Sequence, residues 1–333
     1  MTLTSLDKQN ILSKLKGKKI AVLYGGISEE REVSLRSGSN VYEAIMSFKE
    51  LRDNCILIDV QNHYDVVEIL KKEKVEYCYN ILHGTFGEDG SIQGLLDCLG
   101  IKYTGENTLL SALCMNKVYT KRIWKSSNIS TVDFILLKDV ISVTDKEVRA
   151  YNNCSINYPM ILKPICSGSS VGVSLIHNRA EFDKILYDIG DNNYNYFIEP
   201  FIKGREVTVG ISRGFDNSID ILPLLGINSK NEIYDYDAKY TPGKTELEVP
   251  AKVSTEIEEL IKLECSRAYE VLGCEGLCRI DVMIGEDNSI NLMEINTQGG
   301  MTNTSDIPAM AKSANIAFED IILYVFGLML QKK

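Results

Sequence analysis

Strands and helices alternate through the first hundred residues, and no other feature of the sequence constrains the fold as strongly. Apolar runs at "KIAVLYGG", "CILIDV" and "EYCYNIL" predict strands, and residues 29–46, 65–72 and 91–99 have the pattern of helices. This order predicts a parallel sheet with helices on its faces. Ligands of such sheets bind beyond the carboxyl ends of the strands, which read "YGGISEERE" and "HGTFGEDG" here.

The rest of the chain, which has 333 residues in all, continues this mixture without repeats and is long enough for two or three domains. One helix is predicted over "LLSALCMNKVYTKRIWKSS". It is followed by two strands around a Gly/Ser-rich turn in "YPMILKPICSGSSVGVSLI", a helix near residues 180–187 and the strand "YFIEPFI". The strands "REVTVGIS" and "DILPLLGI", a Tyr-rich loop, a helix over residues 254–273, a hairpin and a helix over residues 318–330 complete the pattern.

The hairpin "RIDVMIGEDNSINLMEIN", residues 279–296, carries polar groups in strands that otherwise favour burial. We expect Asp287-Asn288 to form a two-residue turn, because Asn and Asp tolerate the positive φ angles that such turns need. This turn pairs Arg279 with Asn296, Asp281 with Glu294, Val282 with Met293 and Ile284 with Asn291. Side chains alternate across a strand. One face is therefore predicted to hold Arg279, Asp281, Glu294 and Asn296, and the other Ile280, Val282, Ile284, Met293 and Ile295.

Two carboxylates directly opposite each other should destabilise this strand pair. A divalent cation beside Asp281 and Glu294 would reverse the sign of that interaction. Mg²⁺ prefers carboxylate and amide oxygens and usually shares its coordination shell with substrate phosphates. The alternative is a solvated sheet face with a salt bridge to Arg279. We favour the metal site, because these strands are too apolar for a ribbon at the edge of a sheet.

Charge and cysteine content exclude several functional classes. A formal net charge of -10 argues against a nucleic-acid partner but not against a nucleotide, since local Lys residues and Mg²⁺ can reverse the local field. The nine cysteines have no CxxC or Cys/His metal spacing, and Cys274 and Cys278 have no partner pair, so reduced thiols in a cytoplasmic protein are expected. The polar N-terminal segment is unlike a secretory signal, and the run "IILYVFGLML" is too short for a bilayer, so we expect no membrane partner.

Three glycine-containing segments were considered for nucleotide binding. In "ILKPICSGSSVGVS" small residues let backbone N–H groups approach an anion and Lys163 adds positive charge, although an ordinary hairpin with a solvated Lys163 explains the segment as well. "AKYTPGKT" fits a relaxed phosphate-loop pattern, but "ELEVPA" follows where that loop needs a helix, so we reject it. "YGGISEERE" lacks G-x-G-x-x-G, which removes the main support for a dehydrogenase.

Other positions have a structural and a functional interpretation. Ser28 is predicted to cap the following helix, with Glu30 near the positive end of that helix. His83 is either a turn residue or a functional group at the carboxyl end of a strand. Pro200 has no N–H to donate to a neighbouring strand, so "YFIEPFI" is expected at a sheet edge or a hinge. Its unpaired backbone groups would then contact the edge of a purine, or the segment is a plain linker between two domains.

With these segments in order, the chain resembles the D-alanine–D-alanine ligases of the ATP-grasp superfamily from about Lys18 to the last helix. The most specific segments are "GGISEEREVSLRSG", "HGTFGEDGSIQGLL", "MNKVYTK", "LKPICSGSSVGVS", "YDYDAKY", "CRIDVMI" and "MEINTQGGMT". The resemblance implies an α/β, three-domain ATP-grasp fold with an N-terminal parallel-sheet domain at residues 1–106, a central domain at 107–202 and a C-terminal domain at 203–333. It also implies ATP between the last two domains, and a homodimer.

The resemblance further implies roles for individual residues. Those implied for ATP are Lys117, Lys163 and Ser170 for the phosphates, Glu199, Phe201 and Ile202 for the adenine, and Glu206 for the ribose. Those implied for two Mg²⁺ or Mn²⁺ ions are Asp281, Glu294 and Asn296. Those implied in catalysis are Glu30, Ser169, Tyr240, Arg279 and Gly300, and those near the D-alanine substrates are His83, Lys239 and Ser305.

The implied reaction joins two D-alanine molecules in two steps for peptidoglycan precursor synthesis. The first D-alanine carboxylate attacks the γ-phosphate of ATP and becomes an acyl phosphate, from which the amine of the second D-alanine displaces phosphate. Metal ions and Lys or Arg side chains neutralise the like charges. Water must be excluded from the acyl phosphate. The resemblance places a lid at residues 234–246, where Tyr240 closes against Glu30 and Ser169.

The sequence departs from the family pattern at Gly299, where proline is usual, and at Asp306, where an apolar residue touches the second substrate. Asp306 either faces that pocket or caps a helix near Pro308, and a proline just inside a helix start favours the cap. Two alternatives stay open: a ligase with D-serine or D-lactate as second substrate, and a nucleotide-binding protein without activity. Tyr240 favours attack by an amine, and the intact carboxylate and Lys residues favour an enzyme.

Overall fold

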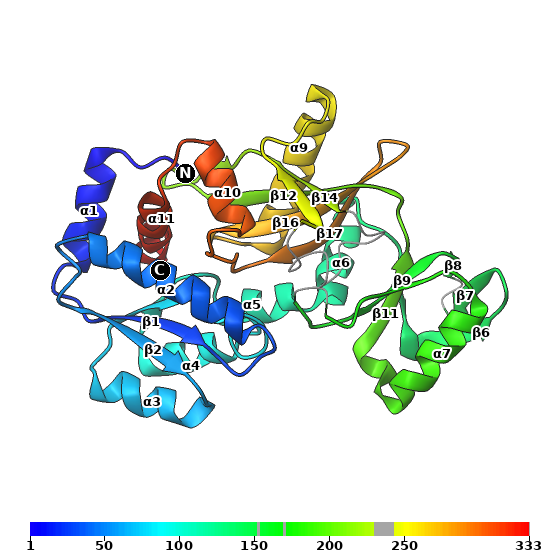
Figure 1. The fold of residues 1–333 in the computed structure, drawn as a ribbon, viewed down its shortest axis with the longest axis horizontal. Coiled ribbons are helices and arrows are strands. Elements are labelled where there is room, and N and C mark those ends of the chain that lie inside the picture. Colours follow the sequence, from blue (N-terminus) through cyan, green and yellow to red (C-terminus); the bar gives the residue numbers. More distant parts are fainter. Residues whose placement is uncertain (152–153, 169–170, 230–242, 333) are drawn as a thin grey trace.

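The computed structural model describes residues 1–151, 154–168, 171–229 and 243–332, and Figure 1 shows their arrangement. The helices are α1 (Ser5–Leu15), α2 (Arg31–Ser47), α3 (His63–Lys72), α4 (Ser91–Leu99), α5 (Thr108–Met115), α6 (Lys117–Ser126), α7 (Arg179–Ile189), α9 (Thr255–Leu272), α10 (Asp306–Ser313) and α11 (Phe318–Gln331), with short 3-10 helices at Leu137–Asp139 and Gly190–Asn195. The strands are β1 (Ile20–Gly25), β2 (Cys55–Val60), β3 (Tyr77–Asn80), β4 (Lys102–Tyr103), β5 (Ile135–Leu136), β6 (Val140–Val143), β7 (Glu147–Ala150), β8 (Ser155–Asn157), β9 (Met160–Pro164), β10 (Ser174–Ile176), β11 (Tyr196–Pro200), β12 (Gly204–Arg213), β13 (Ile219–Ile221), β14 (Leu225–Ser229), β15 (Thr245–Glu248), β16 (Cys278–Gly285) and β17 (Ile290–Asn296).

The N-terminal sheet is parallel, which confirms the prediction from the strand–helix alternation. Its strand order is β2-β1-β3-β4, and Ile20 pairs with Cys55 on one side and Tyr77 on the other. The central strand β1 is inaccessible from Ile20 to Leu23, as expected where helices cover both faces. The carboxyl ends of β1 and β3 lie side by side, because the two strands are paired in parallel. Beyond these ends the Ser28 hydroxyl donates to the His83 carbonyl at 2.6 Å.

Two expectations for the middle of the chain are corrected. The single helix predicted over residues 109–127 is two helices, α5 and α6, because Asn116 adopts an extended backbone and its side chain caps α6 by accepting from the Tyr119 N–H. Strand β11 lies between β9 and β5, so of the two positions expected for this segment, an edge or a hinge, the edge was wrong. Pro200 is tolerated there because it is the last residue of β11, from which the chain crosses to β12 in the next sheet.

The hairpin β16–β17 belongs to an antiparallel sheet of order β15-β14-β12-β16-β17, to which β13 adds beside β12. At its open end Arg279 pairs with Asn296 and Asp281 with Glu294, as predicted. Near the turn the prediction was wrong by one residue, and the pairs are Val282 with Leu292, Met283 with Asn291 and Ile284 with Ile290. The predicted two-residue turn is a three-residue loop: the Gly285 N–H bonds the Ser289 carbonyl, and Asn288 has a φ of 64°.

A bulge between Asp281 and Val282 absorbs the extra residue, so the polar end keeps its register. The consequence is that Met293 leaves the apolar face on which it was expected and lines a cavity, whereas Leu292 is fully buried.

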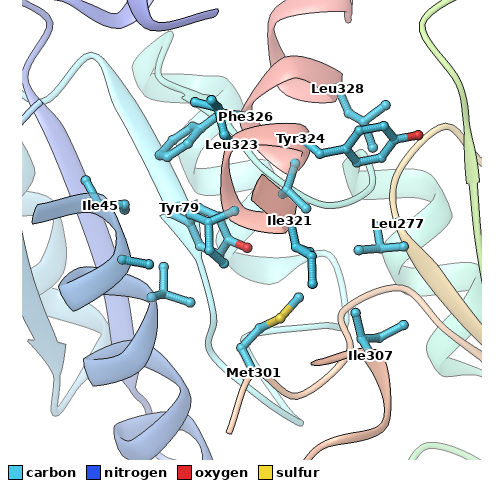
Figure 2. Packing of buried hydrophobic residues seen from close by; sticks show 14 of the residues in the cluster. Ile45, Tyr79, Leu277, Met301, Ile307, Ile321, Leu323, Tyr324, Phe326 and Leu328 are labelled. Carbon is cyan, nitrogen blue, oxygen red and sulfur yellow. The ribbon is translucent and has the colours of Figure 1, made fainter. Parts of the chain in front are cut away.

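The largest hydrophobic cluster connects the N-terminal sheet with the antiparallel sheet that contains the hairpin. Figure 2 shows Ile321, Leu323 and Phe326 of α11 packed among Tyr79 of β3 and Met301, with Ile45 of α2 and Ile307 of α10 in the same cluster. Residues 321–329 of α11 are buried throughout, which explains the apolar run noted in the sequence. Among the described residues no single helix is long and apolar enough to cross a membrane, and only the bent pair α10 and α11 meets that criterion when taken together. The domain boundaries stay a prediction.

Candidate active site

Two neighbouring cavities meet on the polar face of the β16–β17 hairpin. The first cavity, of about 530 Å³, has three walls. One is strand β9 with the segment after it, the second is the crossing from β11 to β12, and the third is the hairpin. The second cavity, of about 550 Å³, lies between the ends of β1 and β3, the hairpin and the start of α10. The residues that line both are Glu206, Ile227, Asp281 and Glu294. A ligand in one cavity is therefore adjacent, across two acidic residues of the hairpin, to a ligand in the other.

The carboxylates of the hairpin have cationic partners. Arg279 donates from Nε and Nη2 to the two oxygens of Asp281, each at 2.8 Å, and Glu294 lies 3.1 Å from the Lys117 ammonium. Thr208 donates to Asp281 at 2.6 Å. The repulsion expected between Asp281 and Glu294 is thus offset without a metal, and the salt bridge to Arg279, which was the alternative interpretation, is present. The face is not solvated as that alternative supposed, because Asp281 is 6% exposed, and the metal site stays a prediction.

The donor set still fits a divalent cation. Asp281 and Glu294 face one cavity from paired positions, and the Asn296 amide lies beside them, 3.3 Å from an Asp281 oxygen. Carboxylate and amide oxygens at the edge of a cavity that also contains two Lys ammonium groups are suited to Mg²⁺ shared with phosphates.

Arg279 also reaches the second cavity. Its Nη1 donates to Asp306 at 3.1 Å, so the guanidinium lies between two aspartates. Burial lowers the pKa of Arg279, but Asp281 and Asp306 outweigh burial, and the pKa is raised well above its ordinary value. Arg279 is therefore a permanent cation between the two cavities.

The capping role favoured for Asp306 was wrong. Ser305 is the N-cap of α10, and Asp306 is the first residue of the helix, with its side chain lining the second cavity. The Ser305 hydroxyl accepts from the Thr302 N–H at 3.0 Å, which stabilises the approach to α10. A Cβ at Gly300 would lie 2.7 Å from that hydroxyl, so glycine is needed for this close approach.

A buried charge triad lies behind the first cavity, and of its three residues only Lys163 lines that cavity. Glu199 is fully buried, with Lys163 at 2.5 Å from one oxygen and Lys121 at 3.1 Å from the other. Neither contact has good hydrogen-bond angles, so attraction between charges is the main interaction. Burial raises the pKa of Glu199, but the two Lys residues outweigh it and lower the pKa. Burial lowers the pKa of Lys121, whereas at Lys163 the attraction of Glu199 outweighs burial and raises the pKa. The shifts at Glu199 and Lys163 favour the ionised forms of these groups, whereas burial of Lys121 opposes its charge.

The rest of the first cavity combines apolar walls with backbone groups. Its lining includes Phe201 and Ile202 at the crossing from β11 to β12, Glu206 on β12, Met283 and Met293 on the hairpin, and Lys117 at the start of α6. Cys166, beside this cavity, is exposed. Partial burial raises the pKa of Cys166, and the opposing cation is Lys117.

Glu30 and His83 line the second cavity. A Cβ at Gly168 would lie 2.3 Å from a Glu30 oxygen, so the absence of a side chain at this position lets the loop after β9 pack over the Glu30 carboxylate. His83 is 3.7 Å from Glu88, and its Nε2 is buried without a partner among the described residues. Burial lowers the pKa of His83, but Glu88 and Glu30 outweigh burial and raise it. Ser28 is not the helix cap; Glu30 occupies that position, and the Ser28 hydroxyl accepts the Glu30 N–H at 3.2 Å.

Comparison with known proteins identifies the family. A model of the D-ala D-ala ligase C-terminus matches residues 123–326, and a model of the N-terminus matches residues 65–106. The D-alanine–D-alanine ligase of Geotalea uraniireducens is 38% identical, with 93% of this chain and 95% of that protein covered. The corresponding protein of Carboxydothermus hydrogenoformans is 35% identical, with coverages of 94% and 98%.

The chain belongs to the D-alanine–D-alanine ligase family.

Solved structures agree with this assignment to the D-alanine–D-alanine ligase family. The ligase of Bacillus anthracis has a TM-score of 0.78 at 30% identity and covers 95% of this chain and 98% of its own. Its complex with ATP has a TM-score of 0.77 at 28% identity, with the same coverages. The VanG D-Ala:D-Ser ligase of Enterococcus faecalis has a TM-score of 0.73 at 26% identity and covers 94% of this chain and 100% of its own. The ATP-grasp fold expected from the sequence is confirmed.

Some residues predicted to act in this ligase-family site lie outside the described residues, namely Ser169, Ser170, Lys239 and Tyr240. Conversely, sequence analysis missed Lys121, Arg36, Glu88 and Gln298, which line or support the cavities. Lys121 had a usable signal, because it lies four residues after Lys117 and hence on the same side of a helix. Gln298 had none, since its contacts with Asn80 at 2.9 Å and with the Leu82 carbonyl at 2.5 Å join distant segments.

Proposed function

We propose that this chain is an ADP-forming ligase that joins two D-alanine molecules at the expense of ATP, for the synthesis of peptidoglycan precursors. The observation that carries the proposal is the pair of cavities that meet at Asp281 and Glu294, because the reaction needs a nucleotide and two amino acids on either side of one charged centre. The relatives that cover nearly the whole chain are named for this activity.

ATP is placed in the first cavity. The adenine lies at Glu199 and the backbone of Phe201 and Ile202, and the ribose lies at Glu206. The phosphates extend toward Lys117 and Lys163, whose ammonium groups supply local positive charge although the chain as a whole is acidic. Ser170 is assigned to the phosphates as well. The support is the polarity of this cavity, which changes from the apolar walls at Met283 to the ammonium groups of Lys117 and Lys163.

Asp281, Glu294 and Asn296 are proposed to hold two Mg²⁺ or Mn²⁺ ions, which neutralise phosphate charge when bound. Lys117, which now pairs with Glu294, then becomes available to phosphate oxygens. Because the triad below keeps a second Lys beside Glu199, Lys163 can turn toward phosphate without leaving an unpaired buried carboxylate.

The amino acids are placed in the second cavity. Glu30 holds the ammonium group of the first D-alanine, and Lys239 with Ser305 holds the carboxylate of the second. A carboxylate oxygen of the first D-alanine attacks the γ-phosphorus, and ADP leaves. The neutral amine of the second then attacks the acyl carbon, and inorganic phosphate leaves as the peptide bond forms. Arg279 stabilises the negative charge that develops on the transferred group and on the tetrahedral intermediate.

Water must be kept from the acyl phosphate, and Tyr240 with Glu30 and Ser169 is proposed to close the site. His83 and Gly300 complete the cavity: His83 by its position beside Glu30, and Gly300 by allowing the close approach of Ser305. We further propose that the protein acts as a homodimer in the cytoplasm, with no nucleic-acid or membrane partner.

A D-alanine:D-serine ligase is the second candidate, because Asp306 lines the second cavity and the VanG ligase has this fold at 26% identity. One assay tests both proposals. Phosphate release from ATP is measured with D-alanine alone, and then with D-serine or D-lactate added, and the products are separated by mass spectrometry. D-alanyl-D-alanine as the main product is expected. No phosphate release with any of these substrates would refute the ligase activity.

A further inference from the structure

A buried group of thiols and one carboxylate lies behind the hairpin, away from both cavities. Glu106, in the segment between β4 and α5, meets Cys274, which follows α9, and Cys278, which is the first residue of β16. Their ligand atoms all lie within 4.8 Å of one another, and all three residues are buried. Cys114 of α5 is hydrogen-bonded to Cys274 and adds a third buried thiol. Sequence analysis treated Cys274 and Cys278 as unpartnered, because Glu106 and Cys114 are more than a hundred residues away.

One distance within the group equals the separation of two ligands in a tetrahedral site. Zn–S bonds of about 2.3 Å and Zn–O bonds of about 2.0 Å, at the tetrahedral angle, separate a sulfur ligand from an oxygen ligand by about 3.5 Å. The Cys278 Sγ lies 3.5 Å from the Glu106 Oε1. The same distance suits a thiol that donates to a carboxylate, so the group can exist with or without a cation.

The surroundings hold the carboxylate in place. The Glu106 Oε1 accepts the N–H groups of Glu275 and Gly276 at 2.9 and 2.7 Å, and Lys332 donates to the carbonyls of Tyr103 and Gly105 close by. Burial raises the pKa of Glu106, and attraction to Lys332 opposes that shift without cancelling it. Without a cation the thiols are neutral, because burial raises the pKa of Cys278 to about 12.

We propose that Cys274, Cys278 and Glu106 form a structural binding site for one Zn²⁺ ion, with Cys114 beside it as a neutral thiol that is not a ligand. Zn²⁺ bonds to the two sulfurs as their S–H bonds break, and the two protons leave to solvent. Two positive charges enter and two leave, so the net charge of this buried region, Lys332 included, is unchanged. Thiolate ligands select a borderline-soft cation over Mg²⁺, which distinguishes this site from the oxygen-lined hairpin.

The position of the site gives it a mechanical consequence. Cys278 precedes Arg279 directly on β16, and its side chain lies on the opposite face of the strand. A cation here ties the segment after β4 to the strand that carries Arg279 and Asp281. Binding to the folded chain alone raises the melting temperature by several degrees at a hundredfold excess over Kd.

Cobalt substitution tests the proposal on the purified full-length chain. After treatment with a chelator, Co²⁺ is added and the near-ultraviolet charge-transfer absorption of cobalt thiolates is followed. We expect saturation at one Co²⁺ per chain, loss of the band when Zn²⁺ is added, and persistence in millimolar Mg²⁺. About two protons should be released per Zn²⁺. Cys278→Ser should abolish the band and Glu106→Gln should weaken Co²⁺ binding at least tenfold.

Matched controls separate this site from others. Cys166→Ser and Cys98→Ser remove exposed thiols outside the group and should leave the band unchanged. Asp281→Asn should leave it unchanged too, which excludes the hairpin as its source. If Cys278→Ser does not fold, alkylation of the wild type in mild denaturant replaces it, and Zn²⁺ should protect Cys274 and Cys278 but not Cys98. The absence of a thiolate band in the wild type, or equal alkylation with and without Zn²⁺, would overturn the proposal.

Discussion

Replacing Asp306 by Leu should tighten the binding of the second D-alanine. The structure places the Asp306 carboxylate in the second cavity, where it accepts from Arg279 Nη1 at 3.1 Å. Arg279 has five N–H donors, of which Asp281 takes two and Asp306 one. Removing Asp306 frees a donor on the side of the second substrate and removes a carboxylate that repels the carboxylate of that substrate.

The size of the effect follows from an exchange of partners. A charge-assisted hydrogen bond contributes about 1.5–3 kcal/mol, but Arg279 gives up one carboxylate as it gains another, so only part of this appears as affinity. A net gain of about 1 kcal/mol corresponds to a KM for the second D-alanine that is about fivefold lower. The KM for ATP should not change, because Asp306 does not line the first cavity.

Stability should fall slightly in the same variant. The side chains of Arg279 and Asp306 are 19% and 16% exposed, so the pair is largely shielded, and its loss should cost about 1 kcal/mol. Asp320→Leu is the matched control. Asp320 also lies in the first turn of a helix, α11, and pairs with Lys8 at 2.6 Å, but it lines neither cavity. This control should lose similar stability with no change in either KM.

Steady-state kinetics with D-alanine and ATP varied in turn, together with urea unfolding, give all the required values. A second-substrate KM that is unchanged or higher in Asp306→Leu, with Arg279 intact, would refute the view that Asp306 competes with the substrate for the guanidinium.

Four further changes have expected outcomes. Asp281→Asn or Glu294→Gln should nearly abolish turnover, and normal turnover at limiting Mg²⁺ would contradict the metal assignment. Asp281→Asn should also destabilise the chain by about 1–3 kcal/mol, because a carboxylate paired with Arg279 is lost. Lys121→Met should lower the free energy of unfolding, measured with urea, by about 2–3 kcal/mol. This is less than the 3–5 kcal/mol expected for a fully unpaired buried charge, because Glu199 keeps Lys163 as a partner. An unchanged free energy of unfolding would contradict the proposed role of the triad. Tyr240→Phe should weaken lid closure by about 1 kcal/mol and shift the preference for the second substrate from D-alanine toward D-lactate. An unchanged ratio of the two products would argue against the lid contact. Cys166 should be alkylated slowly in the free protein, and ATP with Mg²⁺ should protect it. Equal labelling with and without nucleotide, measured by mass spectrometry, would exclude its position beside the nucleotide.

Short-range features of this chain were predictable from sequence. The strand at residues 55–60 and the helix at residues 91–99 have the predicted bounds, because apolar periodicity and capping residues act within a few positions of the chain. The pairing of Asp281 with Glu294 was predictable for a related reason, since a short hairpin admits few registers. The ATP-grasp fold and the ligase family followed from segments whose order and spacing are specific.

Where short-range signals competed, sequence alone was insufficient. Asn116 divides a run of helix-forming residues because its side chain caps the second helix, and the loop after Gly285 has three residues rather than two. In each case two local conformations differ by about 1 kcal/mol, and tertiary packing selects one of them. The bulge beside Val282 shows this selection, because it buries Leu292 while the polar end of the hairpin keeps its register.

The sequence by itself determined which residues carry charge and where strands and helices occur, since these depend on side-chain chemistry and local periodicity. Only the tertiary structure decided the partners of the buried polar groups. Glu199 meets Lys121 and Lys163 from separate elements, and Glu106 meets Cys278 from a segment 172 positions away. The physical reason is that a buried polar group must be paired or it costs several kcal/mol, but many arrangements satisfy that requirement. The packing of apolar faces, which involves the whole chain at once, selects one of those arrangements.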